Sequence, residues 1–371
     1  MDGAPVYLDS NATAPVRPEA RAAVLAALAE PANPSSVHGF GRRARAALER
    51  ARRVVAEAVG AAPGGVIFVS GGTEANNLAL RGVGGPVLVS AVEHPSVLEA
   101  VPDAVRIPVD GDGRIDLAAL GRLIALHRPR LVSVMLANNE TGVIQPVAEA
   151  ARQAHAADAW LHVDAAQALG RIPVAMDGLG ADLLTLSGHK LGGPPGAGAL
   201  VVREGVALSP VQRGGGQELR RRAGTEGLPA ILGMAAAIGA IGPDEPGRLL
   251  TLRGRLERRI GEACPAARIV GAGADRLPNT TCLMLTGVEG ATQLMALDLA
   301  GVAVSTGSAC SSGKVGPSHV LLAMGYSEAL ARCAIRVSTG WASGEADVER
   351  FLAVWLPLAA RTLAPRAAGT T

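Results

Sequence analysis

The sequence predicts an α/β protein with a mostly parallel sheet. Between about residues 65 and 205, short β-branched apolar runs alternate with helical patterns. Many of these runs are apolar on both sides, which a parallel sheet covered by helices on both faces requires. Polar clusters follow five of the runs, and ligands bind such sheets at the carboxyl ends of their strands. We therefore expect a binding site along that edge.

The first predicted element is an amphipathic helix over residues 42–59. Six arginines give it a basic face, which we interpret as a solvated surface without an assigned function. Predicted strands then follow at 66–70, 86–90, 105–109, 131–136, 160–164, 182–187 and 199–203. The polar clusters at the strand ends read SGGTEANN, EHPS, NNETG, DAAQ and SGHK. They come after the first, second, fourth, fifth and sixth strands.

The pattern changes beyond a Gly/Arg-rich stretch at 213–227. A helical region runs to about residue 263, and predicted strands at 281–287 and 334–340 follow, with helices near 290–300, 318–324 and 345–361. These elements indicate a smaller α+β domain, and the turn-rich GPDEPG at 242–247 indicates the boundary. We predict a large domain over 15–245 and a small domain formed by 1–14 and 246–371.

Composition excludes several classes of protein. The 371 residues carry a net charge of +2 and only eight aromatic side chains, which argues against a nucleic-acid surface. The longest uncharged stretch, 227–243, is broken by glycines and falls short of the roughly 20 apolar residues of a membrane span. The first residues lack the pattern of a signal peptide. We expect a cytoplasmic protein. The four cysteines match no zinc spacing, so no metal site is predicted.

Lys190 and Lys314 are the only lysines of a chain that otherwise uses arginine. Arginine cannot act as an amine nucleophile, so a lysine needed for a Schiff base could not drift to arginine. Lys190 directly follows a predicted strand, among small residues. Asp164, at the end of another predicted strand, could keep a pyridine nitrogen protonated. Alternatively, it could be the N-cap of the following helix. Together they are parts of a pyridoxal phosphate site.

The remaining parts of such a site also follow strands. Gly71, Gly72 and Thr73 open a helix, where free amides and the helix dipole hold an anion, although many ordinary turns share this pattern. Ser187 and His189 add donors. His94 could stack on the cofactor ring and move protons near neutral pH, or be a structural histidine.

Cys310 lies in a run of small and polar residues, STGSACSSGKVGPS, which is typical of an exposed mobile loop. A cysteine is unusual there, and it is either a reactive or an incidental thiol. By contrast, Cys282 and Cys333 lie in apolar strands and Cys264 also has a structural context. Arg336 could bind a carboxylate as a two-pronged fork, although most arginines in strands are structural.

The chain resembles cysteine desulfurases of the NifS/IscS type, in the class V aminotransferase group of fold type I pyridoxal phosphate enzymes. The resemblance covers residues 6 to 355 and rests on these motifs in order: VYLDSNATAPV, NPSSVHGFG, SGGTEANNLAL, VEHPSVLEA, LANNETGVIQP, HVDAAQ, SGHKLGGPPGAGAL, RAGTE, STGSACSS and IRVSTG. It implies a fold type I enzyme that converts L-cysteine to L-alanine.

The resemblance also implies a role for each matching residue. Lys190 would form the Schiff base, and Asp164 would pair with the pyridinium. Gln167 would bond the phenolic oxygen, and His94 would stack on the ring and shuttle protons. Asn139 would hold cofactor and substrate.

Further roles concern the phosphate, the substrate and sulfur. Gly72, Thr73, Ser187 and His189 would bind the phosphate, joined by Thr225 from the partner subunit of a homodimer. Arg336 and Asn33 would hold the carboxylate of L-cysteine. Cys310 would attack the substrate sulfur and keep it as a persulfide.

Partners and alternative functions follow from the same resemblance. The spacing after Cys310 is similar to that of the long-loop group, which delivers sulfur to acceptor proteins such as an iron–sulfur scaffold or the tRNA-thiolation machinery. The short Ala-rich tail puts docking of a scaffold in doubt. A selenocysteine lyase or another fold type I enzyme is one alternative. A non-catalytic sulfur-carrier or scaffold subunit is the other, against which Lys190 argues.

Overall fold

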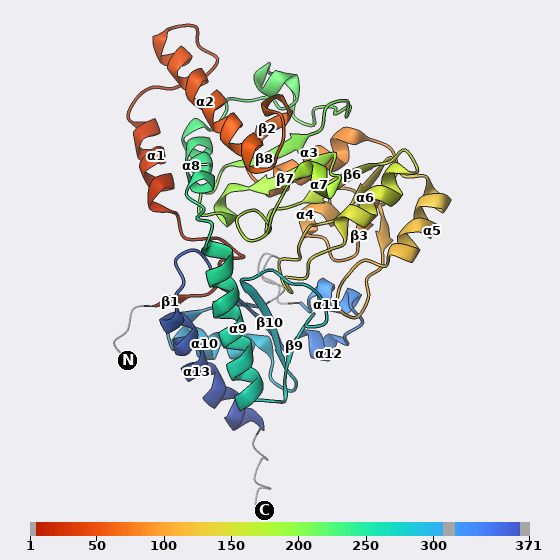
Figure 1. Cartoon of the computed structure of the whole chain (residues 1–371), viewed down its shortest axis with the longest axis vertical. Coiled ribbons are helices and arrows are strands. Elements are labelled where there is room, and N and C mark those ends of the chain that lie inside the picture. Colours follow the sequence, from red (N-terminus) through yellow and green to blue (C-terminus); the bar gives the residue numbers. More distant parts are fainter. Residues whose placement is uncertain (1–4, 307–315, 364–371) are drawn as a thin grey trace, which may run out of the picture.

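The computed structural model describes residues 5–306 and 316–363 (Figure 1). Its largest sheet has the strand order β2-β8-β7-β6-β5-β3-β4, and only β8 runs antiparallel to its neighbours. The strands are β2 (Val66–Val69), β3 (Val87–Ser90), β4 (Val105–Ile107), β5 (Leu131–Ser133), β6 (Trp160–Asp164), β7 (Leu183–Ser187) and β8 (Gly198–Val202). The predicted α/β fold with a mostly parallel sheet is confirmed.

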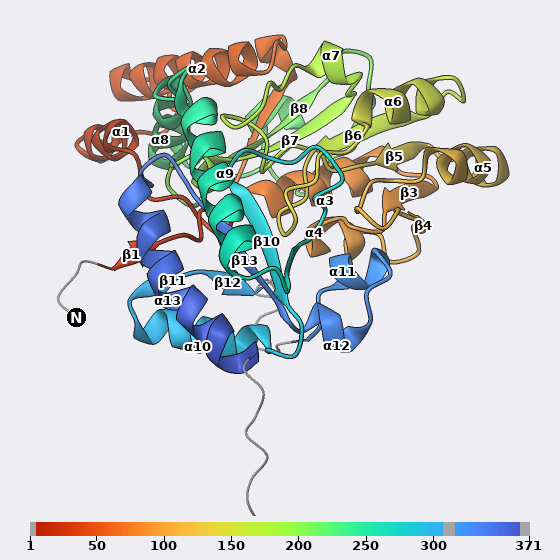
Figure 2. The same ribbon diagram turned by 60° about the horizontal axis from the view of Figure 1, so that its bottom comes forward.

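Helices cover both faces of this sheet, as the apolar runs require (Figure 2). Along β2, Val66 and Phe68 pack into one core while Ile67 and Val69 pack into the other, because successive side chains of a strand point to opposite faces. The first core contains residues of α2 (Gly39–Ala58), α5 (Leu117–His127), α6 (Val147–His155), α7 (Met176–Leu179) and α8 (Leu228–Gly239). The second contains residues of α3 (Gly72–Val83) and α4 (Pro95–Leu98).

One arginine of α2 departs from the solvated basic face that its sequence indicated. Arg52 is buried and donates to both carboxylate oxygens of Glu218, at 2.7 and 2.9 Å. Glu218 also accepts from the Phe68 amide, and it begins a run of three left-handed residues, Glu218, Leu219 and Arg220. The interpretation as a solvated face is therefore wrong for Arg52, which anchors the segment that leads to Thr225.

A second group of elements lies below the large sheet in Figure 1. A four-stranded antiparallel sheet has the order β12-β13-β10-β9, and β1 pairs with β11 in parallel. Its strands are β1 (Val6–Tyr7), β9 (Ala267–Ile269), β10 (Thr280–Leu285), β11 (Val302–Ala303), β12 (Ser305–Thr306) and β13 (Ala334–Ser338). Its helices are α9 (Glu245–Ala263), α10 (Gly290–Leu299), α11 (His319–Ala323), α12 (Glu328–Ala331) and α13 (Glu345–Leu363). The predicted division into domains stays a prediction.

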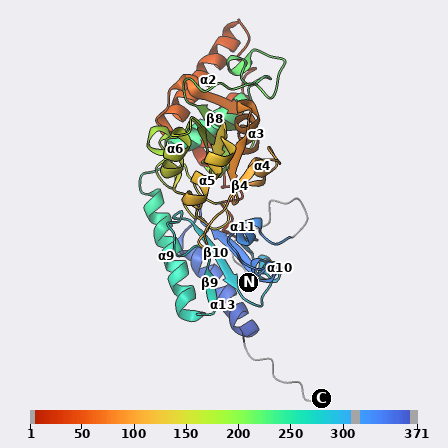
Figure 3. The same cartoon turned by 90° about the vertical axis from the view of Figure 1, so that its right-hand side faces the viewer.

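The two groups of elements are packed against each other (Figure 3). Val92 and Met135, which follow β3 and β5, share an apolar cluster with Met284 of β10 and with Val320 and Leu321 of α11. The N-terminal segment after β1 crosses between the groups before α1 (Pro18–Leu28) begins. Within the described residues, no helix has the length and apolar character needed to cross a membrane.

Candidate active site

A cavity of about 320 Å³ lies where the carboxyl ends of the parallel strands meet. Nine of the predicted site residues line it, and so do six residues without a predicted role. The predicted ones are Gly72, Thr73, His94, Asn139, Asp164, Gln167, Ser187, His189 and Lys190. The others are Asn11, Asn76, Ser96, Met135, Ala137 and Ala166.

Lys190 is held at this edge by the turn that follows β7. The strand ends at Ser187, and the 3-10 turn Gly188–Lys190 brings the amine back toward the cavity. Its Nζ donates to the carbonyls of Asn11 and Ala12, at 2.6 and 2.7 Å. These bonds hold the amine at the cavity, and its predicted role as the Schiff-base nucleophile stays a prediction.

The first turn of α3 also lines the cavity and has the features of an anion site. Gly72 and Thr73 begin this 12-residue helix, whose first amides lack helical partners and carry the positive end of the dipole. Ser187 is buried beside them, and a Cβ on Gly72 would lie 3.5 Å from the Cβ of Ser187. Burial and the Lys190 charge lower the pKa of His189 to about 4. A phosphate group bound here would therefore meet hydroxyls and neutral donors.

Asp164 is the last residue of β6 and is buried. Its Oδ1 accepts from the Ala166 amide at 2.9 Å, and its Oδ2 accepts from Asn76 at 2.8 Å. A buried carboxylate needs such donors. His94 is the N-cap of α4, and its Nδ1 contacts the amide and hydroxyl of Ser96. Burial lowers the pKa of His94, and the Lys190 charge adds to this, while Asp164 opposes it.

Gln167 and Asn139 reach the cavity from two further loops. The Gln167 side chain donates to the Asn11 carbonyl and accepts from Arg171. The Asn139 carbonyl accepts from Asn11 and from Arg336, both at 3.0 Å. Through its carbonyl and its side chain, Asn11 is thus bonded to three residues that line the cavity: Lys190, Gln167 and Asn139.

Arg336 lies behind the wall formed by Asn139. Its guanidinium donates to the Asp9 carboxylate at 2.7 Å, it is 2% exposed, and it does not line the cavity. Its Nε has no partner among the described residues. Its predicted binding of a substrate carboxylate stays a prediction.

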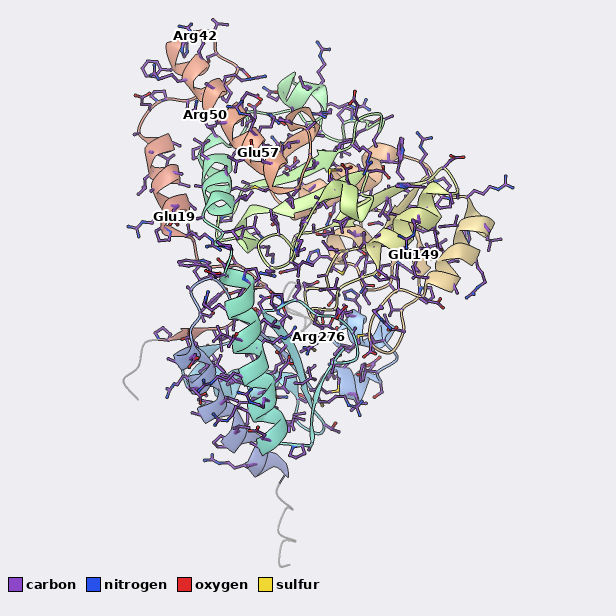
Figure 4. All side chains as sticks on the ribbon, viewed as in Figure 1. Glu19, Arg42, Arg50, Glu57, Glu149 and Arg276 are labelled. Atoms are coloured by element: carbon purple, nitrogen blue, oxygen red, sulfur yellow. The ribbon has the colours of Figure 1, made fainter. Side chains whose placement is uncertain are left out.

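Three predicted site residues are not brought to the cavity by the described chain. Asn33 is exposed and lies in the loop before α2, the helix that carries the labelled Arg42, Arg50 and Glu57 in Figure 4. Thr225 is exposed, in the segment before α8. Cys310 lies outside the described residues. The predicted roles of these three residues stay untested.

Two buried acids next to the site carry strongly raised pKa values. Burial raises the pKa of Glu93 well above its ordinary value, and the nearby Asp164 charge adds to this. Burial also raises the pKa of Glu140 to about 7, although the Ser318 hydroxyl donates to it and the Arg336 charge opposes the rise. For both acids burial is the largest cause of the raised pKa, and for Glu93 the Asp164 charge acts in the same direction.

Sequence reasoning missed Asn11, Asn76 and Ser96. Asn76 is three residues after Thr73 and so on the same side of α3, a spacing that could have indicated it. Ser96 follows His94-Pro95, and a proline just inside a helix start is a usual pattern. Asn11 carried no chemical signal beyond its place in the opening motif.

The model of the family "Aminotransferase class-V" matches residues 6–351. The chain belongs to the class V aminotransferase family. It is 46% identical to a cysteine desulfurase of Cereibacter sphaeroides, over 95% of each chain. It is 42% identical to the cysteine desulfurase IscS of Dictyoglomus turgidum, over 94% of this chain and 93% of that one. The structure of a NifS-like protein from Rickettsia africae is similar, with a TM-score of 0.89 and 33% identity over 95% of this chain and 99% of that one.

The family indicates the cofactor, and the desulfurase relatives and similar structures indicate the activity. The chain is a pyridoxal 5'-phosphate-dependent enzyme that acts as a cysteine desulfurase. The cavity fits this cofactor by the chemistry of its lining: hydroxyls and helix amides for a phosphate, a buried carboxylate and a primary amine. When bound, pyridoxal phosphate supplies an electron sink for the substrate carbons.

Proposed function

We propose that Lys190, Asp164 and His94 carry the cofactor chemistry of this desulfurase, and that Cys310 takes the sulfur. The observation that carries the proposal is that one cavity gathers Lys190, Asp164 and the first turn of α3. Lys190 holds the cofactor covalently, Asp164 keeps its pyridine nitrogen protonated, and Gln167 bonds its phenolic oxygen. Gly72, Thr73, Ser187 and His189 hold the phosphate, and Asn139 and Arg336 orient the substrate, with Asn33 as a further carboxylate ligand.

The sulfur step balances without an external oxidant. The Cys310 thiolate forms a bond to the sulfur of L-cysteine as the carbon–sulfur bond of the substrate breaks. The released electron pair passes to the carbon side, where protonation completes L-alanine. The enzyme retains a persulfide, which a reductant or an acceptor protein removes. His94 is the group placed to move protons in these steps.

The proposed partners are L-cysteine, a second copy of the chain and a sulfur-acceptor or iron–sulfur scaffold protein. Neither a nucleic acid nor a membrane is proposed, and a cytoplasmic location remains a prediction. The second candidate function, selenocysteine lyase, rests on the same cavity. Release of alanine from L-selenocysteine but not from L-cysteine would favour it.

Replacement of Asp164 by asparagine should reduce alanine release from L-cysteine by about 100-fold or more. The variant loses the charge that holds the pyridine proton, and a charged partner lost from a buried site is worth several kcal/mol. One side-chain oxygen could still accept from the Ala166 amide, but the new NH2 group would face the donor of Asn76. The measurement is alanine produced per folded enzyme.

Asp182→Asn is the matched control for this variant. Asp182 is also buried and accepts a backbone N–H, from Leu161, but it does not line the cavity. It should lose stability while each folded molecule keeps its turnover. The role of Asp164 is wrong if Asp164→Asn stays within twofold of the parent.

Thr225 should act in the site of the partner subunit. Thr225→Ala should then weaken retention of the cofactor about tenfold, the value of one hydrogen bond to a charged group. Mixing Thr225→Ala with Lys190→Ala subunits should restore activity, because the Lys190-containing site of the hybrid dimer receives Thr225 from the other subunit. Alanine release before and after mixing measures this.

Sedimentation provides the independent check on the dimer. The parent enzyme should sediment as a dimer at full cofactor occupancy. A monomer with full occupancy, or hybrid dimers no more active than the separate variants, would contradict the proposal.

A further inference from the structure

Four side chains form a continuous hydrogen-bonded chain from the buried carboxylate of Asp164 to the ring of His94. Asn76 Nδ2 donates to Asp164 Oδ2 at 2.8 Å and to Ser96 Oγ at 2.9 Å. Ser96 Oγ lies 2.8 Å from Nδ1 of His94. Asn76 is 1% exposed and Ser96 is 9% exposed, so water cannot readily replace these bonds.

The direction of each bond is fixed by the chemistry of its ends. The oxygen of an ionised carboxylate can only accept, so the NH2 group of Asn76, not its oxygen, must face Asp164. The second hydrogen of that NH2 group then points to Ser96 Oγ. The Oδ1 of Asn76 has no hydrogen-bond partner among the described residues, so this orientation leaves one buried acceptor unsatisfied.

His94 receives two donors on the same ring nitrogen. The backbone N–H of Ser96 points to Nδ1 at 3.1 Å, and an amide N–H is always a donor. The Ser96 hydroxyl accepts from Asn76 and is free to donate its own hydrogen to Nδ1. Nδ1 must therefore be the unprotonated nitrogen of a neutral ring, and the proton lies on Nε2.

We propose that Ser96 and Asn76 are positioning residues, which hold neutral His94 in its Nε2–H tautomer and couple its orientation to that of Asp164. In this state His94 can donate a hydrogen from Nε2. The one ring lone pair that could accept a hydrogen is on Nδ1, and Ser96 already donates to it. His94 therefore serves first as a hydrogen donor through Nε2, and it can accept a proton on Nδ1 only when the hydrogen bonds from Ser96 break. The inference rests on the proposed role of His94 and specifies it.

Hydrogen bonds to the neutral ring also disfavour its protonation. The charged or titratable groups that act on His94 are Asp164, Lys190, His319 and Glu99. All of them stay in place when only the Ser96 hydroxyl is removed. Ser96→Ala should therefore raise the pKa of the His94 ring by about half to one pH unit, the value of one ordinary hydrogen bond.

The test is nitrogen NMR of holoenzyme carrying 15N in its histidine rings, with the His94 signals assigned by their loss in His94→Gln. In the parent, neutral His94 should show a protonated Nε2 and an unprotonated Nδ1. Ser96→Ala should raise the ring pKa and lower kcat for alanine release more than it changes KM. Ser96→Thr, which restores the hydroxyl, should reverse both effects.

Ser327→Ala is the matched control. Ser327 is the N-cap of another short helix, α12, where its hydroxyl oxygen accepts from a backbone amide, but it does not line the cavity. It should change neither the ring nor kcat. A neutral His94 with its proton on Nδ1, or a ring pKa that is the same in the parent and in Ser96→Ala, overturns the inference. Loss of the proposed desulfurase role itself would appear separately, as a parent that releases no alanine.

Discussion

Lys190→Ala should lose covalent attachment of pyridoxal phosphate and about a thousandfold or more of turnover, which is about 4 kcal/mol of barrier. Lys190 is the one lysine among the described residues that line the cavity, and its amine can attack the cofactor aldehyde. The chain has one other lysine, Lys314. Borohydride reduction followed by mass spectrometry should find the cofactor on the Lys190 peptide of the parent and nowhere in the variant.

Two further variants separate the amine from its charge and from the other lysine. Lys190→Arg keeps a cation that can donate to the carbonyls of Asn11 and Ala12, but it has no amine, so it should lose attachment as completely as Lys190→Ala. Lys314→Ala should keep both the attachment and its absorbance. Covalent cofactor retained by Lys190→Ala would refute the assignment.

Cys310→Ser should bind the cofactor and L-cysteine normally but lose about a hundredfold to a thousandfold of alanine release, because a hydroxyl cannot take the sulfur. The parent, treated with L-cysteine in the absence of reductant, should gain one sulfur on the peptide that contains Cys310. The absorbance change that L-cysteine causes should remain in the variant, since Lys190 and Asp164 are unchanged. Peptide mass mapping and alanine release measure the two parts.

The other cysteines provide the controls for this prediction. Cys264, Cys282 and Cys333 are buried, and burial raises the pKa of Cys282 to about 12, so its thiolate is scarce at neutral pH. Cys264→Ser and Cys333→Ser should keep the persulfide on the Cys310 peptide. Sulfur found on another cysteine, or normal turnover by Cys310→Ser, would exclude Cys310 as the acceptor.

The residues that the sequence located well stand at the ends of parallel strands. Asp164 ends β6 and Lys190 follows β7, so their shared edge follows from the βαβ pattern alone. The antiparallel direction of β8 was not predictable in the same way, because a buried apolar run reads alike in both directions. Strands of two or three residues such as β1 and β11 are too short for any periodicity.

Contacts between distant segments account for what the sequence did not predict at the site. Asn76 meets Asp164 across 88 positions of the chain, and Arg52 meets Glu218 across 166. Neither pair has a spacing that a local pattern could reveal. Both depend on where α2 and α3 pack on the sheet, which is decided by the apolar cores and not by the polar residues themselves.

The position of Asn11 links the completion of the site to the order of synthesis. This N-terminal residue is fixed by bonds to Asn139 and to Thr280, Asn279 and Ser338, while its carbonyl accepts from Lys190 and Gln167. Domains fold as the chain leaves the ribosome, from the N-terminus onward. The large sheet can therefore form early, yet the carbonyl that receives the Lys190 amine waits for residue 338. The Lys190 amine thus gains its full set of positioning bonds only when nearly the whole chain has been synthesised.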